Sequence, residues 1–141
     1  MTGVQTCALP IFDASAVLQA VAPDEQGRLG EEIRARIELE GAFAPPGFAD
    51  EVVQAAAKGV RMGRWSADTA RSVVAQIADL EITLADRVRP SLEQLEVALE
   101  LGLTGLDAAY VHLARETGLP LATADRTMRA AAERAGVRTM L

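Results

Sequence analysis

The chain of 141 residues is poor in several residue types, and each shortage excludes a class of protein. Cys7 is the only cysteine, so an internal disulfide is impossible and a reducing, cytoplasmic location is expected. No apolar run reaches the roughly 20 residues of a membrane-spanning helix, so we expect no membrane association. Aromatic residues make up only 4% of the chain, yet 50% of the residues are hydrophobic, which suits one domain with a core of small apolar side chains.

Basic residues are also few, and nearly all of them are arginine. The formal net charge is −6, and Lys58 is the only lysine beside thirteen arginines. This balance does not favour a nucleic-acid binder, because phosphate contacts require basic side chains. However, a bound metal would cover some of the acids, arginine suits bidentate phosphate contact, and an acidic surface suits a basic protein partner. The net charge therefore excludes neither an RNA substrate nor a protein partner.

The first ten residues, MTGVQTCALP, carry little periodicity and resemble translated sequencing-adaptor read-through. Pro10 supports a foreign origin, since proline is poorly tolerated in a central strand. We therefore interpret 1–10 as a non-native N-terminus and place the domain at 11–141.

Apolar spacing and turn residues predict alternating strands and helices over the rest of the chain. The expected strands are 11–12, 42–44, 81–84, 119–123 and 137–141. The expected helices are 14–21, a segment through 33 and 37, 48–60, 66–79, 90–101, 104–116 and 126–135. This order is typical of an α/β fold with a parallel sheet and helices on both faces. In such folds the working crevice lies outside the carboxyl ends of the strands.

Four acidic residues in apolar surroundings lie at the predicted junctions of strands and helices. They are Asp13 in IFDASAVL, Glu51 in FADEVVQAA, Asp107 in GLDAAYVHLA and Asp125 in LATADRTM. Taken singly, each has a simpler interpretation as a helix cap or a solvated acid, and Asp50 competes with Glu51 for any role. Taken together, they predict one acidic pocket.

A pocket of this kind requires a counter-charge. Two carboxylates about 4 Å apart repel by roughly 4 kcal/mol at an effective dielectric near 20. All-oxygen ligation favours Mg²⁺ or Mn²⁺ over zinc, and such ions activate water for phosphodiester cleavage. The acids therefore predict metal-dependent chemistry on a phosphodiester.

Three segments, FDASAVL, APPGFADEVVQAA and GLDAAYVHLARETGLPLATADRTMRAAAERAGV, resemble the PIN-domain nucleases, in particular the VapC-like toxins of type II toxin–antitoxin pairs. The resemblance covers about residues 11–141. It implies one PIN-like domain, with a parallel five-stranded sheet flanked by helices. It also implies an endoribonuclease that cleaves RNA with Mg²⁺ or Mn²⁺, binds a cognate antitoxin and forms a homodimer. The implied catalytic and metal-binding residues are Asp13, Glu51, Asp107 and Asp125.

The same resemblance makes Ser15 and Thr123 the expected supporting residues, because a small hydroxyl side chain often accompanies these acids in the family. The chain departs from the family pattern in two places. The first strand is short, and Gln54 stands where an asparagine commonly follows the second acid by three positions.

Several other side chains have weaker claims to a role. Arg126 and Arg129 stand near the fourth acid and are expected to touch RNA. Lys58, Arg61 and Arg64 form either a phosphate-facing strip or a solvated helix end.

The remaining large or titratable side chains have structural interpretations. His112, the only histidine, lies about 140° from Asp107 on a helical projection and is interpreted as a surface residue. Trp65 is interpreted as packing against the helix that Ser66 caps.

Two other functions stay open at this stage: a PIN nuclease in RNA processing outside a toxin pair, and a non-catalytic α/β binding module. A phospho-receiver would need an acidic pair near the first strand and a lysine after a late strand. This chain has Asp13 alone near the first strand and its only lysine, Lys58, in mid-chain. A haloacid-dehalogenase-type phosphatase would need an aspartate two residues after Asp13, where Ser15 stands.

Overall fold

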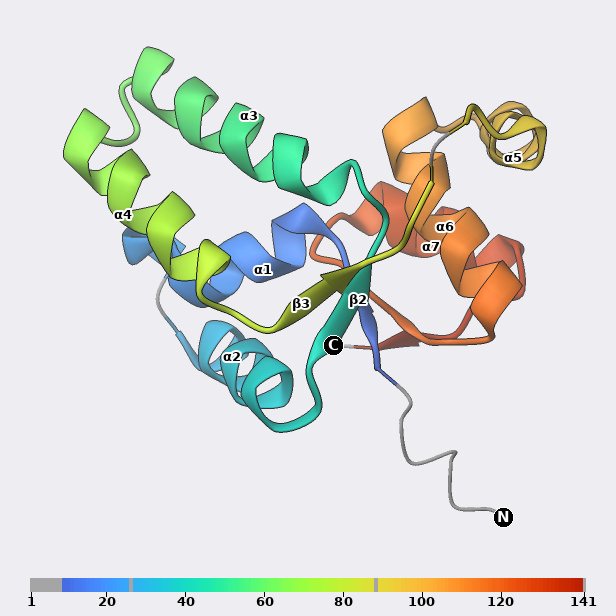
Figure 1. The fold of residues 1–141 in the computed structure, drawn as a ribbon, viewed down its shortest axis with the longest axis horizontal. Helices are drawn as coiled ribbons and strands as arrows, with labels where there is room; N and C mark the ends of the chain where they lie inside the picture. Colours follow the sequence, from blue (N-terminus) through green and yellow to red (C-terminus); the bar gives the residue numbers. More distant parts are fainter. Residues whose placement is uncertain (1–8, 26, 88, 141) are drawn as a thin grey trace.

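Five parallel strands form the centre of the molecule, in the order β3-β2-β1-β4-β5 (Figure 1). The computed structural model describes residues 9–25, 27–87 and 89–140. Every adjacent pair of strands is parallel, which confirms the predicted fold class. The strands are β1 (Ile11–Phe12), β2 (Ala42–Ala44), β3 (Ile82–Leu84), β4 (Leu121–Ala122) and β5 (Thr139–Met140).

In the described ranges, seven α-helices connect the strands and cover both faces of the sheet. They are α1 (Ala14–Val21), α2 (Arg28–Glu40), α3 (Phe48–Arg61), α4 (Ala67–Ala78), α5 (Leu92–Leu101), α6 (Gly105–Thr117) and α7 (Arg126–Arg134), with a short 3₁₀ turn, η2 (Pro23–Glu25), after α1. Helices α1 to α4 lie on one side of the sheet and α5 to α7 on the other (Figure 1). This split follows from right-handed crossovers, because the chain builds the sheet outward from β1 and then returns to build its other half.

The helices begin where the sequence places a hydrogen-bonding cap. The side chains of Ser66, Ser91 and Thr104 accept hydrogen bonds from the backbone amides of Thr69, Gln94 and Asp107. These caps confirm the predicted starts of α4, α5 and α6.

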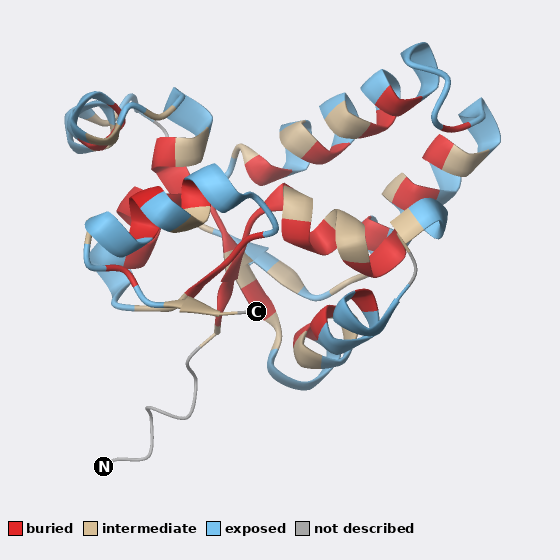
Figure 2. Ribbon diagram, turned by 180° about the vertical axis from the view of Figure 1, so that it is seen from behind, coloured by how far each residue is buried: buried red, intermediate tan, exposed pale blue. Residues whose placement is uncertain are grey.

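The core is densest around the central strand. Ile11 and Phe12 of β1 are fully buried, and so are Leu121 of β4 and Tyr110 of α6. Figure 2 shows buried residues along the central strands, and the residues from Ala108 to Ala114 of α6 are buried as well. Gly30 lets α2 lie directly on α1, since a Cβ at this position would stand 2.3 Å from the carbonyl oxygen of Gln19.

Pro10 belongs to the packed structure, although the sequence placed it outside the domain. It is buried, and its carbonyl oxygen accepts a hydrogen bond of 2.9 Å from the amide of Phe43 in β2. A proline fits here because only its carbonyl is used in the sheet. The prediction of a non-native N-terminus covers 1–10 and stays a prediction, since 1–8 lie outside the described residues.

No single helix in the described part of the chain is both long enough and apolar enough to cross a bilayer. Helices α5 and α6, which meet at a bend of 107°, pass that test only as a pair and only by length and composition.

Candidate active site

The strand order reverses around β1, which lies between β2 and β4, and α/β sheets commonly bind their ligands outside the carboxyl ends of the strands at such a point. Asp13 follows β1 directly and is the N-cap of α1, while Asp125 is the N-cap of α7, shortly after β4. The backbone amide of Asp13 donates to the carbonyl oxygen of Ala122 at 3.1 Å, which continues the β1–β4 pairing beyond the strands. The two acids therefore stand on neighbouring strand ends, as the sequence predicts.

Asp13 is the most buried of the four acids, with only 3% of its surface exposed. Its Oδ1 accepts hydrogen bonds from the Ser15 hydroxyl at 2.8 Å and the Ala16 amide at 2.9 Å, and its Oδ2 accepts one from the Thr123 hydroxyl. Burial raises the pKa of Asp13, although all three hydrogen bonds act to lower it. The hydrogen bonds therefore hold the Asp13 carboxylate in position without neutralising its charge.

Ser15 and Thr123 connect Asp13 to the loop after β4. The Ser15 hydroxyl accepts a hydrogen bond from the Ala124 amide at 3.1 Å, and the Thr123 hydroxyl accepts one from the Asp125 amide at 3.0 Å. Both hydroxyls therefore contact Asp13 and the segment that carries the fourth acid.

Glu51 lies in the first turn of α3 and accepts a hydrogen bond of 2.6 Å from the hydroxyl of Tyr110 in α6. Burial raises the pKa of Glu51, and so do the charges of Asp107 and Asp13, while the bond from Tyr110 lowers it. Burial and the contact with Glu51 in turn raise the pKa of the Tyr110 hydroxyl, which stays a donor. Asp50 is exposed on the same helix, so the geometry favours Glu51 over its neighbour.

Tyr110 was not expected among the site residues. The sequence places it on the same helical face as Asp107, which indicates only that it faces inward. Its partner is 59 residues away on another helix, so no local pattern could identify the contact.

Asp107 lies in the first turn of α6 and is partly buried. Burial raises its pKa, and the charge of Asp125 raises it further. Asp125 uses Oδ1 to accept the amides of Thr127 and Met128, which leaves its other carboxylate oxygen for a further contact.

The four acids form one electrostatic group. The charge of Asp125 raises the pKa of Asp13 and of Asp107, and the charges of Asp13 and Asp107 both raise the pKa of Glu51. Four carboxylates from four segments make an all-oxygen donor set with surplus negative charge, which fits a hard divalent cation. In the described part of the chain, the one trio of potential metal ligands within 4.8 Å of one another lies elsewhere, so no three of the four acids bring their ligand atoms that close together.

The predicted basic residues fall into two groups. Arg126 and Arg129 line a pocket of about 310 Å³ together with Thr123, and Arg129 donates to the Thr123 carbonyl oxygen at 2.8 Å. Lys58 and Arg61 lie in the last turn of α3, about 10 to 15 Å along the helix from the first turn. The first group therefore borders the acids and the second does not.

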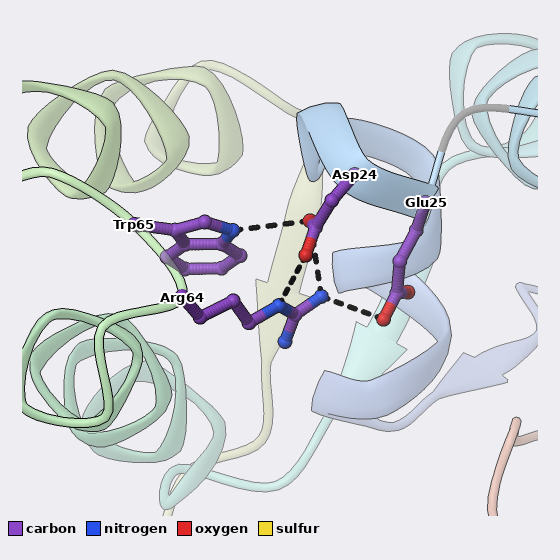
Figure 3. Close-up of polar contacts among 4 residues, drawn as sticks. All are labelled: Asp24, Glu25, Arg64 and Trp65. Atoms are coloured by element: carbon purple, nitrogen blue, oxygen red, sulfur yellow. Dashed lines mark hydrogen bonds and ion pairs between the residues drawn. The ribbon is translucent and has the colours of Figure 1, made fainter.

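Arg64 is held in a separate cluster at the far end of the α3–α4 hairpin (Figure 3). Its guanidinium forms ion pairs with Asp24 and Glu25 and lies 4.6 Å from the centre of the Trp65 ring, while Trp65 donates to Asp24 at 3.0 Å. The Arg64 guanidinium lowers the pKa of Asp24 to about 2. Trp65 is buried, as expected of a packing residue, but it packs closely on Gly59 of α3, whereas the prediction was packing on the helix that Ser66 caps.

The interpretation of His112 as a surface residue is wrong. Only 8% of His112 is exposed, because α6 is covered by the sheet on one side and by α5 on another. A helical projection that considers only one covered face cannot predict this burial.

Comparison with known proteins identifies the family and a similar fold. The family model that describes the PIN domain matches residues 11–134. Among solved structures, the chain is similar to the crystal structure of PAE2754 from Pyrobaculum aerophilum, with a TM-score of 0.72 and 25% sequence identity, over 94% of this chain and 90% of that chain. A search of curated proteins found no match.

Proposed function

Because the chain belongs to the PIN domain family, whose members are generally nucleases, we propose that it is a Mg²⁺- or Mn²⁺-dependent endoribonuclease. The observation that carries the proposal is a group of four carboxylates, two at the carboxyl ends of β1 and β4 and two in the first turns of α3 and α6, in which burial and neighbouring charges raise the pKa of Asp13, Glu51 and Asp107. Such a group is costly for the fold unless a cation binds there.

The residues of the site have distinct roles in this proposal. Asp13, Glu51, Asp107 and Asp125 hold the ion. Ser15 and Thr123 fix the orientation of Asp13, and Tyr110 fixes Glu51, since each donates its hydroxyl proton to a carboxylate. The chemistry that a bound divalent ion supplies is Lewis-acid activation of water and of the scissile phosphodiester.

The RNA is proposed to approach over the loop after β4. Arg126 is exposed there and Arg129 is partly exposed, beside the pocket that Thr123 also lines. Guanidinium groups at this position suit phosphates that flank the cleaved bond. Lys58 and Arg61 would reach only a longer RNA, and Arg64 is left out because its guanidinium is already paired.

We further propose that the chain is the toxin of a toxin–antitoxin pair in the cytoplasm and acts as a homodimer. The features that support a protein partner are the acidic net charge and an apolar groove of about 260 Å³ between α3, α4 and β3. Val53 and Leu84 line this groove and are 55% and 39% exposed.

The test of nuclease activity is cleavage of total RNA with Mn²⁺, with and without EDTA. Asp125→Asn should abolish cleavage and preserve the fold, because asparagine also caps a helix but lacks the charge. Asp50→Asn, which removes an exposed acid near the site, is the matched control and should cleave like the wild type. Cleavage that persists in EDTA or in Asp125→Asn would refute the proposed metal site.

The toxin role is tested separately. Expression of the wild-type chain should arrest growth, and expression of Asp125→Asn should not. Co-expression of the product of an adjacent small reading frame should relieve the arrest. An active nuclease that leaves growth unchanged would instead favour a role in RNA processing.

A further inference from the structure

A second set of potential metal ligands lies between α5 and α6, outside the group of four acids. It consists of Glu93 in the first turn of α5 and of His112 and Glu116 on α6, which we call the α5–α6 cluster. Each residue offers one ligand atom, and these atoms all lie within 4.8 Å of one another. His112 and Glu116 are four positions apart, so their side chains emerge on the same face of the helix.

Within the described residues, the imidazole of His112 has no hydrogen-bond partner, although it is nine-tenths buried. Its side chain is 10% exposed, and its Nε2 lies 3.9 Å from Oε2 of Glu116, which is too long for a hydrogen bond. In the ranges 9–25, 27–87 and 89–140, no hydrogen bond to this ring is found. Buried polar groups are almost always paired, because an unpaired one has lost its hydrogen bonds to water without replacement and destabilises the fold. The ring therefore needs a partner at the point where the two glutamates converge.

The nearby basic side chains do not neutralise the two glutamates of the cluster. Arg115 pairs with Glu100, with 4.0 Å between the charged atoms. Among the residues that the structure describes, no lysine or arginine forms an ion pair with Glu93 or Glu116. Two carboxylates and an imidazole nitrogen thus remain as possible ligands, and the two carboxylate charges match one divalent cation.

We propose that the α5–α6 cluster binds a zinc-like divalent ion and ties α5 to α6. Imidazole nitrogen with carboxylate oxygen favours Zn²⁺ over Mg²⁺. Ligand bonds of about 2.0–2.2 Å in a tetrahedron place ligand atoms about 3.4 Å apart, which small side-chain rotations would reach from the present spacing. Because Glu93 and Glu116 are exposed, the ion has an entry path and water completes the fourth position.

The expected consequence is structural. Helix α6 carries Asp107 in its first turn and Tyr110 one turn later, so an ion that fixes α6 against α5 would also steady the helix that supplies these groups. The site itself does not depend on the proposed nuclease activity, because its residues are distinct from the four acids.

The test is titration of the metal-free, full-length protein with Zn²⁺ by calorimetry and with Co²⁺ by visible absorption. Tetrahedral Co²⁺ bound through nitrogen and oxygen absorbs strongly, whereas six-coordinate Co²⁺ at carboxylates absorbs weakly. Glu93→Gln should weaken binding at least about tenfold, since even loss of an outer partner of a ligand costs about 10–100-fold. Glu96→Gln, an exposed glutamate on the same helix, is the matched control and should bind like the wild type.

His112→Asn should remove the tetrahedral cobalt spectrum, and Asp125→Asn should leave it unchanged. Should His112→Asn fail to fold, the exposed Glu93→Gln variant answers the question alone. Unchanged Zn²⁺ affinity in Glu93→Gln, or a spectrum lost in Asp125→Asn instead, would assign the ion to the four acids and overturn the proposal.

Discussion

Thr123 donates its hydroxyl proton to Oδ2 of Asp13, a contact between residues that are 110 positions apart in the chain. The bond joins the carboxyl ends of β1 and β4, the two strands between which the sheet order reverses. Asp13 receives three hydrogen bonds in all, yet burial raises its pKa above the ordinary value. The fold therefore orients this carboxylate and leaves its charge for a cation to neutralise.

Asp13→Asn is expected to raise the Tm of the metal-free protein at pH 7. The pKa of Asp13 is higher in the folded than in the unfolded chain, so the folded state binds more protons, and stability falls as pH rises from 3.8 through the raised value. The Asp13→Asn variant has no carboxyl proton to lose at this position. Its higher Tm should therefore be present above this pH range and should disappear below pH 3.8. Melting curves in EDTA across this range measure the difference.

Asp50→Asn is the control, because Asp50 is exposed and lies outside the hydrogen bonds of the site. It should melt like the wild type at each pH. A metal-free Asp13→Asn protein that melts below the wild type at pH 7 would show that hydrogen bonding, not charge, dominates at Asp13.

Mn²⁺ is expected to raise the Tm through binding to the folded state alone. At a concentration 100 times the Kd, the free energy of unfolding rises by about 2.7 kcal/mol, or about 5–10 °C for a chain of this size. Glu51→Gln should reduce this shift, whereas Asp50→Asn should retain it. Equal shifts in both variants would mean that Glu51 does not hold the ion.

The sequence predicts the order of the elements and the four acids because both leave local signals. Ser66, Ser91 and Thr104 cap helices by bonds to amides three residues on, and such bonds can be read from the sequence. The parallel sheet follows from the alternation of strands and helices, and the site follows from the strand ends.

Contacts between distant segments could not be predicted in the same way. Tyr110 meets Glu51 across 59 residues, and Arg64 meets Asp24 across 40 residues, with no periodic pattern to mark either pair. His112 is buried because α5 covers a second face of α6, which the spacing of the apolar residues predicts to be exposed. Each miss concerns packing between helices, which depends on the arrangement of the whole fold.

Val53→Glu is expected to convert a homodimer into a monomer. Val53 is 55% exposed and lines the apolar groove between α3, α4 and β3, so a charge there would be desolvated in any interface that covers the groove. Light scattering of the wild type should give twice the chain mass. Leu39→Glu, at an 83% exposed position on α2 outside the groove, should remain dimeric. A monomeric wild type would contradict the proposed dimer.

Substitution of Arg126 should affect RNA binding, and substitution of Arg64 should affect stability. Arg126→Gln is expected to weaken RNA binding and to lower the slope of log affinity against log salt by about one, because one phosphate contact is lost. Arg64→Gln should leave the affinity and the slope unchanged and should instead lower the Tm, because Asp24 and Glu25 lose their cation.

The pH dependence of the Arg64 effect provides an independent check. Arg64 and, to a smaller extent, the hydrogen bond from Trp65 lower the pKa of Asp24 from 3.8 to about 2 in the folded state, so the contribution of Arg64 to stability is present above pH 3.8 and is lost as pH falls through about 2. The difference in Tm between the wild type and Arg64→Gln should therefore shrink as the pH is lowered across that interval. The contact is largely exposed, so salt should reduce the difference as well. A loss of RNA affinity in Arg64→Gln equal to that in Arg126→Gln would return Arg64 to the RNA-binding surface.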